Sequence, residues 1–464
     1  MFEKNDRLGG KLSRLEHQGF VFDLGPTVLT LPDVLRELFQ AYDVPLDQCI
    51  DLRRVDPTCR YHWSDQTVFD AYSDPSRMAE ELNRVFPEDR DALPAFLEDN
   101  AHLYDNTKHI FLFGEFEGFK ELVKLRNILL LPSLLRAGPR TMHASLMRRF
   151  RSAKLVQLLG RFATYNGSSP YRAPAMLNVI SHVELGLGTW YPMGGMSRIV
   201  DALEQLARDA GVEIHTSTPV ESVQCSGNRL TALRAGGKEY PVKNLISNAD
   251  VLWTYRNLLE PAGIPTPRTI AGAERSCSGF LMLAAVKGEH PSLAHHNIFF
   301  SDDYPDEFRD IFERRRLPRQ MTIYVSIASK TDPSLAPPGC ECWYILMNAP
   351  ACGIDHQDQE AQDIFAASVW RRLEEQFGLR PEVLWQSRLT PHDFQHRYNG
   401  ADGALYGASS NSAFSAFLRP RNKAAGLSNL YFAGGSTHPG GGIPLALLSG
   451  RITADRIGRD LGLK

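Results

Sequence analysis

Phe2-Glu3-Lys4-Asn5-Asp6-Arg7-Leu8-Gly9-Gly10-Lys11 opens the chain, and Ala433-Gly434-Gly435-Ser436-Thr437-His438-Pro439-Gly440-Gly441-Gly442-Ile443-Pro444 lies near its end. The first stretch reads as the end of a strand followed by a glycine turn. In a dinucleotide fold, an acidic residue such as Glu3 accepts hydrogen bonds from ribose hydroxyls at this point. The second stretch joins a predicted strand at 430–432 to a predicted helix at about 444–461, whose positive end points at the glycine loop. Together the two stretches predict an α/β nucleotide-binding fold.

Composition places the chain among large globular proteins. With 464 residues, 43% of them hydrophobic, it is too long for one ordinary core, and two interleaved domains are expected. The net charge of -3 gives no electrostatic reason to expect a nucleic-acid partner. The seven scattered cysteines favour a reducing compartment, and the charged N-terminus does not resemble a signal peptide. No apolar run approaches the roughly 18 residues of a membrane span, so we expect a cytoplasmic protein.

The hydrophobic pattern predicts the main elements between the two glycine stretches. Helical spacing of apolar residues predicts helices at 33–43, 75–105 and 196–210. Short strands with turns are expected over 212–247, and mixed strands and helices over 277–390.

Three further motifs carry a family resemblance. They are Phe22-Asp23-Leu24-Gly25-Pro26-Thr27, the stretch 189–203 that contains Met193-Gly194-Gly195-Met196, and Ser247-Asn248-Ala249-Asp250. With the two glycine stretches they resemble the phytoene desaturase family of flavoproteins, from Phe2 to the C-terminus. The resemblance implies an FAD-binding Rossmann-like domain, discontinuous in sequence, with an inserted mixed α+β substrate domain. It also implies desaturation of a carotenoid polyene by hydride transfer to FAD, and residues 163–184 resemble the hydroxycarotenoid 3,4-desaturase branch.

The resemblance also implies domain boundaries and cofactor contacts. The FAD domain would comprise 1–75, 190–260 and 390–464, and the substrate domain 76–189 and 261–389. Glu3 would bind ribose, and Val220 would meet the adenine. The pyrophosphate and flavin edge would be lined by Arg7, Gly9, Gly10 and Lys11. The flavin ring would be surrounded by Gly434, Gly435, Thr437, Gly442 and Ile443.

The glycine loop that holds the pyrophosphate in such folds has no counterpart ahead of Phe2. We therefore expect a chain that lacks the first βα unit of its flavin fold and that binds FAD weakly. A flavin-free remnant, acting as a membrane-associated subunit, is one alternative to an enzyme. A carotenoid cis-trans isomerase on the same fold is another.

Catalytic groups are not evident in the sequence. Hydride removal from a polyene needs no acid–base dyad, and none is found. Arg161, Tyr165 and Tyr191 are candidates to face a substrate tunnel, but we interpret them as a solvated arginine and core tyrosines. A metal site at Cys340, Cys342, Cys352 and His356 is disfavoured, because the alternating pattern over 343–347 predicts a strand.

The region 108–154 has the composition of a membrane-facing surface. From Lys120 to Lys154 it holds nine basic residues and one acidic residue, Glu121, interleaved with leucines and other apolar residues. Apolar side chains can enter the acyl boundary while cations meet anionic headgroups. Because a carotenoid must be drawn from a bilayer, we expect peripheral membrane binding here.

Overall fold

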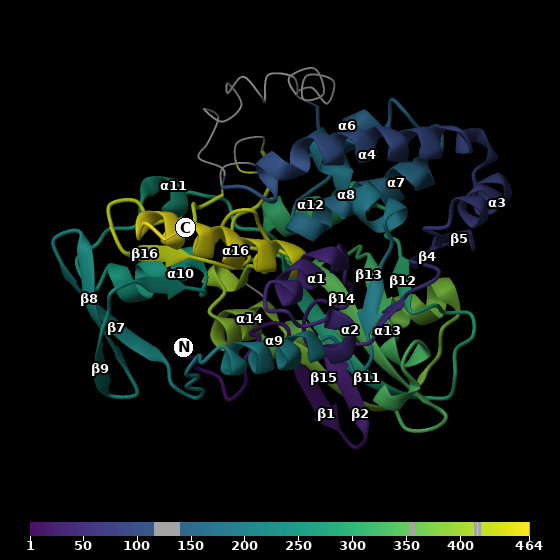
Figure 1. The fold of residues 1–464 in the computed structure, drawn as a ribbon. Helices are drawn as coiled ribbons and strands as arrows, with labels where there is room; N and C mark the ends of the chain where they lie inside the picture. Colours follow the sequence, from purple (N-terminus) through teal and green to yellow (C-terminus); the bar gives the residue numbers. More distant parts are fainter. Residues whose placement is uncertain (116–139, 352–357, 413–414, 416–418, 464) are drawn as a thin grey trace.

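The fold is seen in a computed structural model, which describes residues 1–115, 140–351, 358–412, 415 and 419–463. A seven-stranded mixed sheet dominates one half of the molecule, in the order β15-β11-β14-β13-β12-β4-β5 (Figure 1). Neighbouring strands are antiparallel except β12 and β4, which are parallel. The strands are β4 (Cys59–His62), β5 (Val68–Ala71), β11 (Ser278–Lys287), β12 (His296–Phe299), β13 (Ile323–Ser326), β14 (Cys340–Ala349) and β15 (Glu382–Leu389).

Strand β11 explains why this sheet is covered on both faces. Its run of apolar residues is buried from Ser278 to Val286. Phe280 and Met282 pack into the core on one face, which includes Phe365 of α13 (Gln359–Phe377). Leu281 and Leu283 alternate with them and enter the core of the opposite face. A strand of unbroken hydrophobicity is stable only when both of its faces are buried in this way.

The second half of the molecule is built from short pieces far apart in sequence (Figure 1). Phe2 makes a parallel bridge with His215, and β10 pairs in parallel with β16. A three-stranded antiparallel sheet, β7-β8-β9, lies beside them. The elements are β7 (Val220–Ser226), β8 (Arg229–Ala235), β9 (Lys238–Pro241), β10 (Leu245–Ser247), β16 (Leu430–Phe432), α9 (Arg198–Asp209), α10 (Val251–Thr254), α11 (Arg268–Ala271) and α16 (Ile443–Asp460).

A helical layer packs against the edge of the large sheet near β4 and β12 (Figure 1). Side-chain caps fix where its helices begin: Asp74 accepts from Arg77 N, Thr141 from Ala144 N and Ser152 from Leu155 N. The layer contains α3 (Pro75–Val85), α4 (Ala92–Phe111), α6 (Met142–Leu146), α7 (Ala153–Gly160), α8 (Val179–Ser181) and α12 (Tyr304–Arg309). The remaining elements are β1 (Arg14–His17), β2 (Phe20–Asp23), β3 (Leu52–Arg54), β6 (Trp190–Pro192), α1 (Pro32–Gln40), α2 (Leu46–Cys49) and α14 (Pro391–Tyr398).

Most predicted elements are found. The helix predicted at 196–210 is α9, the strand at 430–432 is β16, and the final helix is α16. The range predicted to be helical over 75–105 holds two helices, because Pro87 begins a short 3-10 turn that separates α3 from α4.

The domain division remains a prediction. Strands β4 and β5, which it assigns to the FAD domain, pair through β12 with the large sheet of the predicted substrate segment.

Among the described residues, no helix combines the length and the apolar character needed to cross a membrane. Two residues weighed for a metal site, Cys352 and His356, fall outside the described residues, whereas Cys340 and Cys342 lie on β14 as the predicted strand requires. The described residues contain no group of three or more potential ligands that could hold a metal ion.

A buried carboxyl group ties the end of β2 to the segment before α9. Asp23 accepts hydrogen bonds from the Tyr191 hydroxyl at 2.7 Å and from the Met196 backbone N–H at 2.9 Å. Burial raises the pKa of Asp23 to about 6, although both hydrogen bonds oppose the shift. The folded protein therefore holds this proton more tightly than the unfolded chain does.

Asp23→Asn tests this linkage. The stabilising contribution of Asp23 protonation is complete below about pH 4 and is lost as the pH rises through about 6. Between pH 4 and pH 7 we expect the unfolding free energy of the wild type to fall relative to that of the variant, by on the order of 3 kcal/mol. Urea denaturation at several pH values measures it, with the exposed Asp33→Asn as control. The prediction would be contradicted if the unfolding free energies of wild type and Asp23→Asn changed equally with pH.

Candidate functional site

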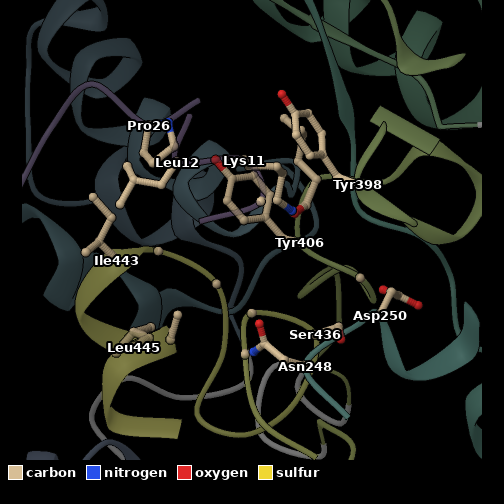
Figure 2. Close-up of a pocket in the computed structure, with 18 of the residues that line it drawn as sticks. Lys11, Leu12, Pro26, Asn248, Asp250, Tyr398, Tyr406, Ser436, Ile443 and Leu445 are labelled. Carbon is tan, nitrogen blue, oxygen red and sulfur yellow. The ribbon is translucent and has the colours of Figure 1, made fainter. Parts of the chain in front are cut away.

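A large cavity lies between the two halves of the molecule. Its volume is about 1940 Å³, well above the roughly 300–1,000 Å³ of a typical ligand pocket, so it has room for a cofactor and a second ligand. Segments from both ends and from the middle of the chain line it. In Figure 2, Lys11 and Tyr406 face the same space as Asn248 and Ile443.

The N-terminal segment contributes Glu3 to the cavity wall. The Glu3 N–H donates to His215 O at 2.8 Å, and its carbonyl accepts from Thr218 N at 2.8 Å. One carboxylate oxygen of Glu3 accepts from Asn5 N at 2.8 Å. Val220 follows this bridge and lines the same part of the cavity. The backbone pairing thus brings together Glu3 and Val220, the residues predicted to meet ribose and adenine.

The predicted glycine turn also reaches the cavity. Gly9, Gly10 and Lys11 line it, whereas Arg7 is exposed and does not. The Lys11 ammonium donates to the Leu405 carbonyl oxygen. Burial lowers the pKa of Lys11, and the nearby charge of Asp250 partly opposes this shift.

The glycine loop between β16 and α16 forms another wall. A Cβ on Gly434 would lie 2.7 Å from Asn248 Nδ2, and the φ of +108° also excludes other residues, so close packing requires glycine here. Gly442, at φ +104°, immediately precedes α16. Gly435, Gly442 and Ile443 line the cavity, as predicted for residues around a ring system. Thr437 does not, because its buried hydroxyl donates to the Pro420 carbonyl at 2.6 Å.

A buried arginine beside this loop was not predicted. Arg419 lines the cavity, is 7% exposed and donates to the Tyr406 carbonyl at 2.9 Å. Burial lowers the pKa of Arg419 to about 10, and its Nη2 atom has no hydrogen-bond partner. No described carboxylate is paired with it. An unneutralised cation with a free donor suits an anionic or electron-rich ligand at this wall.

Another part of the cavity wall is mostly apolar. Leu103 within α4 and Leu112 at its C-terminal end line it together with Leu177, Ile180 and Val183. These side chains form a surface suited to a long hydrocarbon ligand.

The structure places the three catalytic candidates in different environments. Tyr165 lines the cavity, and Tyr191 is a core residue bonded to Asp23, away from the cavity. Arg161 is 8% exposed and lines the cavity, so its interpretation as a solvated arginine is wrong. It forms an ion pair with Glu184, a residue that no sequence motif marks as functional. No local signal marks this pair, because its members lie 23 residues apart on irregular helices.

The cavity fits a flavin. The orphaned Arg419 donor, the glycine wall before α16 and the Glu3 carboxylate are the donors and acceptors that such a cofactor uses. A family model of flavin containing amine oxidoreductases matches residues 1–458.

The chain belongs to the flavin containing amine oxidoreductase family. A 1-hydroxycarotenoid 3,4-desaturase from Flavobacterium sp. (strain P99-3) is 38% identical, over 98% of this chain and 93% of that protein. A 4,4'-diapolycopene oxygenase from Methylomonas sp is 33% identical, over 99% and 93% of the two chains. A zeta-carotene-forming phytoene desaturase from Myxococcus xanthus is also 33% identical, over 98% and 88%. The resemblance to the phytoene desaturase family is confirmed.

Solved structures support the fold of this flavoprotein. An oxidoreductase from Methanosarcina mazei superposes with a TM-score of 0.65 at 16% identity, covering 98% of this chain and 93% of that one. Cyclohexylamine oxidase from Brevibacterium oxydans superposes with a TM-score of 0.58 at 13% identity, covering 99% and 93%. The predicted α/β flavoprotein fold is therefore confirmed.

Proposed function

We propose that the protein is an FAD-dependent carotenoid desaturase. Its relatives include desaturases of carotenoids, and its cavity joins a cofactor-like wall to an apolar chamber. The single observation that carries the proposal is this continuous cavity, because a polyene must lie directly against the group that oxidises it. A hydroxylated carotenoid is the substrate class that the 38% identical relative favours.

The chain's own residues would hold FAD along one wall. Glu3 would bind the ribose hydroxyls and Val220 the adenine, while Gly9, Gly10 and Lys11 would line the pyrophosphate and the flavin edge. Gly434, Gly435, Gly442 and Ile443 would surround the ring, and Arg419 would supply positive charge beside it. Bound FAD would accept the hydride that leaves one carbon of the polyene, while the adjacent carbon releases a proton.

The remaining walls would position the hydrocarbon and exclude water. Ile180, Val183 and Leu177 offer no polar group that could hold water against a reacting carbon. Binding energy from this apolar contact, distributed along a long chain, would hold the polyene against the cofactor wall.

Product mass distinguishes the candidate reactions. Protein reconstituted with FAD is incubated anaerobically with an acyclic hydroxycarotenoid in liposomes, and the products are separated by chromatography. We expect loss of two hydrogens per new double bond and bleaching of the flavin absorbance. An unchanged mass with altered retention would indicate the isomerase. In a parallel incubation in air, gain of oxygen by the carotenoid would indicate the reaction named for the Methylomonas relative. Unaltered carotenoid together with absent flavin absorbance would favour the flavin-free remnant.

Glu3→Gln tests the FAD site. Loss of a charged acceptor for ribose hydroxyls should weaken FAD binding by about 1–3 kcal/mol. Fluorescence titration with FAD measures it, and Asp6→Asn is the matched control because Asp6 is exposed and does not line the cavity. Equal affinities for wild type and Glu3→Gln would show that Glu3 is not the ribose ligand.

We also infer peripheral membrane binding through the region 108–154. Residues 116–139 lie outside the described residues, so the described part alone supports the proposal. Arg140, Arg148 and Arg151 are exposed there, and Met147 is 55% exposed. Lys108, Arg149 and Lys154 are instead paired with Asp105, Asp99 and Asp65, and Leu146 is buried. Among the described residues of this region, the membrane-facing set is thus smaller than the composition predicts.

Co-sedimentation with liposomes tests this surface. Changing Arg140, Arg148 and Arg151 together to Glu should greatly reduce binding to vesicles with anionic lipid, because each cation near such a surface contributes about 1 kcal/mol. High salt should weaken wild-type binding in the same way. The control replaces three exposed arginines elsewhere, Arg208, Arg234 and Arg380, with Glu. Equal loss in both triple variants, or no wild-type binding, would refute the proposal.

A further inference from the structure

A polar cluster interrupts the apolar part of the cavity. Arg161 Nη2 donates to Glu184 Oε1 at 2.8 Å and to the Tyr61 hydroxyl at 2.9 Å. The Tyr165 hydroxyl donates to the other carboxylate oxygen of Glu184. Arg161, Tyr165 and Glu184 line the cavity, whereas Tyr61 is fully buried behind them. Four polar side chains thus converge on one place in a wall that is otherwise suited to hydrocarbon.

Fold stability does not account for this cluster. Glu184 is 2% exposed and Arg161 8%, so both charges have lost most of their hydration. The desolvation of such a pair cancels most of its Coulomb attraction, and apolar residues of similar volume often stabilise a core equally well. An apolar wall at this place would also bind a plain hydrocarbon better.

The cluster has hydrogen-bonding capacity left over. The Nε of Arg161 has no hydrogen-bond partner, but it is fully buried and so is not a donor to a ligand in the cavity. The proton of Tyr165 is directed to Glu184, so the lone pairs of its oxygen remain available on the half-buried side chain that lines the cavity.

The charges and protons define which ligand group fits. The carboxylate of Glu184 neutralises Arg161, so the cluster has no surplus charge for an anion or a cation. Tyr165 has no free proton for a carbonyl, but its oxygen can accept one. The matching ligand group is therefore neutral and carries its own O–H.

We propose that Tyr165, held in place by Glu184 and Arg161, binds a hydroxyl group on the end of the carotenoid. This inference rests on the proposed function and assigns a specificity site to the same cavity. One anchored end fixes how far along the chain the reacting bond lies. Ile180 and Val183, neighbours of the cluster on the cavity wall, would contact the hydrocarbon that follows the hydroxyl.

Two tyrosine variants separate recognition from structure. Tyr165→Phe and Tyr61→Phe each remove one hydroxyl from the same cluster, but only Tyr165 lines the cavity. The probes are an acyclic carotenoid with one terminal hydroxyl and the same polyene without it. Binding in detergent micelles is measured by quenching of tryptophan fluorescence.

We expect the wild type to bind the hydroxylated probe about tenfold more tightly, the value of one buried hydrogen bond. Tyr165→Phe should lose this preference and bind the plain polyene as the wild type does. Tyr61→Phe should keep the preference. An absent preference in the wild type, or an equal weakening of both probes in both variants, would overturn the inference and leave a purely structural cluster.

A parallel assay of desaturation by FAD-loaded protein distinguishes this inference from the proposed function. If neither probe is desaturated, the proposed function fails, and the binding preference still decides the role of Tyr165. If both probes are desaturated and bound alike, the proposed function stands and the hydroxyl site does not.

Discussion

The parallel pairing of β10 with β16 is the constraint on which the site depends. It joins Leu245–Ser247 to Leu430–Phe432, so that the Asn248 segment and the Gly434 loop leave the same edge together. Asn429, the residue before β16, stabilises this register. Its side-chain amide accepts a hydrogen bond from Leu230 N and donates to the Leu230 and Lys243 carbonyls, each at 2.9 Å. Breaking these buried hydrogen bonds of the Asn429 side chain would cost free energy, because each donor and acceptor would lose its partner.

The pairing of β10 with β16 also sets the positions of the segments that follow these two strands. The Val251 N–H donates to Ser436 Oγ at 3.0 Å, and Gly434 N donates to Ser449 Oγ at 3.0 Å. The start of α10, the glycine loop and the middle of α16 are thereby fixed to one another. The geometry of the cofactor wall thus depends on backbone pairing and short polar bonds more than on its lining side chains.

The cavity contains two buried arginines in opposite electrostatic states. Arg161 is balanced by Glu184, and its pKa is well above the usual value: burial opposes this shift, and neighbouring negative and phenolic groups outweigh it. Arg419 has no such partner among the described residues, and burial alone lowers its pKa. A balanced arginine suits a neutral ligand, whereas an unbalanced one favours a ligand that brings negative charge. The walls around the two arginines therefore differ in the chemistry that they accept.

Features of the fold that depend on residues close together in the sequence could be predicted from it, whereas features that depend on distant residues could not. The amphipathic run over 196–210 is a local signal, and α9 forms where that signal places it. The pairing of Glu3 with the 215–218 segment could be inferred only through a family resemblance. Arg161 and Glu184 show the limit, because Glu184 lies on a π-helical turn, His182–Gly186, and Arg161 on a 3-10 turn, Arg161–Asn166.

Those irregular turns help explain why no periodic pattern relates Arg161 to Glu184. In the 3-10 turn, side chains three residues apart lie over one another, whereas in the π turn the repeat is longer than in an α-helix. Arg161 and Glu184 consequently share a wall although no α-helical spacing relates them. Arg161 and Tyr165 are four residues apart, so a regular α-helix would also place them on one face. Glu184 joins them only through tertiary packing, in which it bonds to Arg161 and Tyr165 from a separate turn. Such a contact depends on how distant segments pack, and local spacing does not report it.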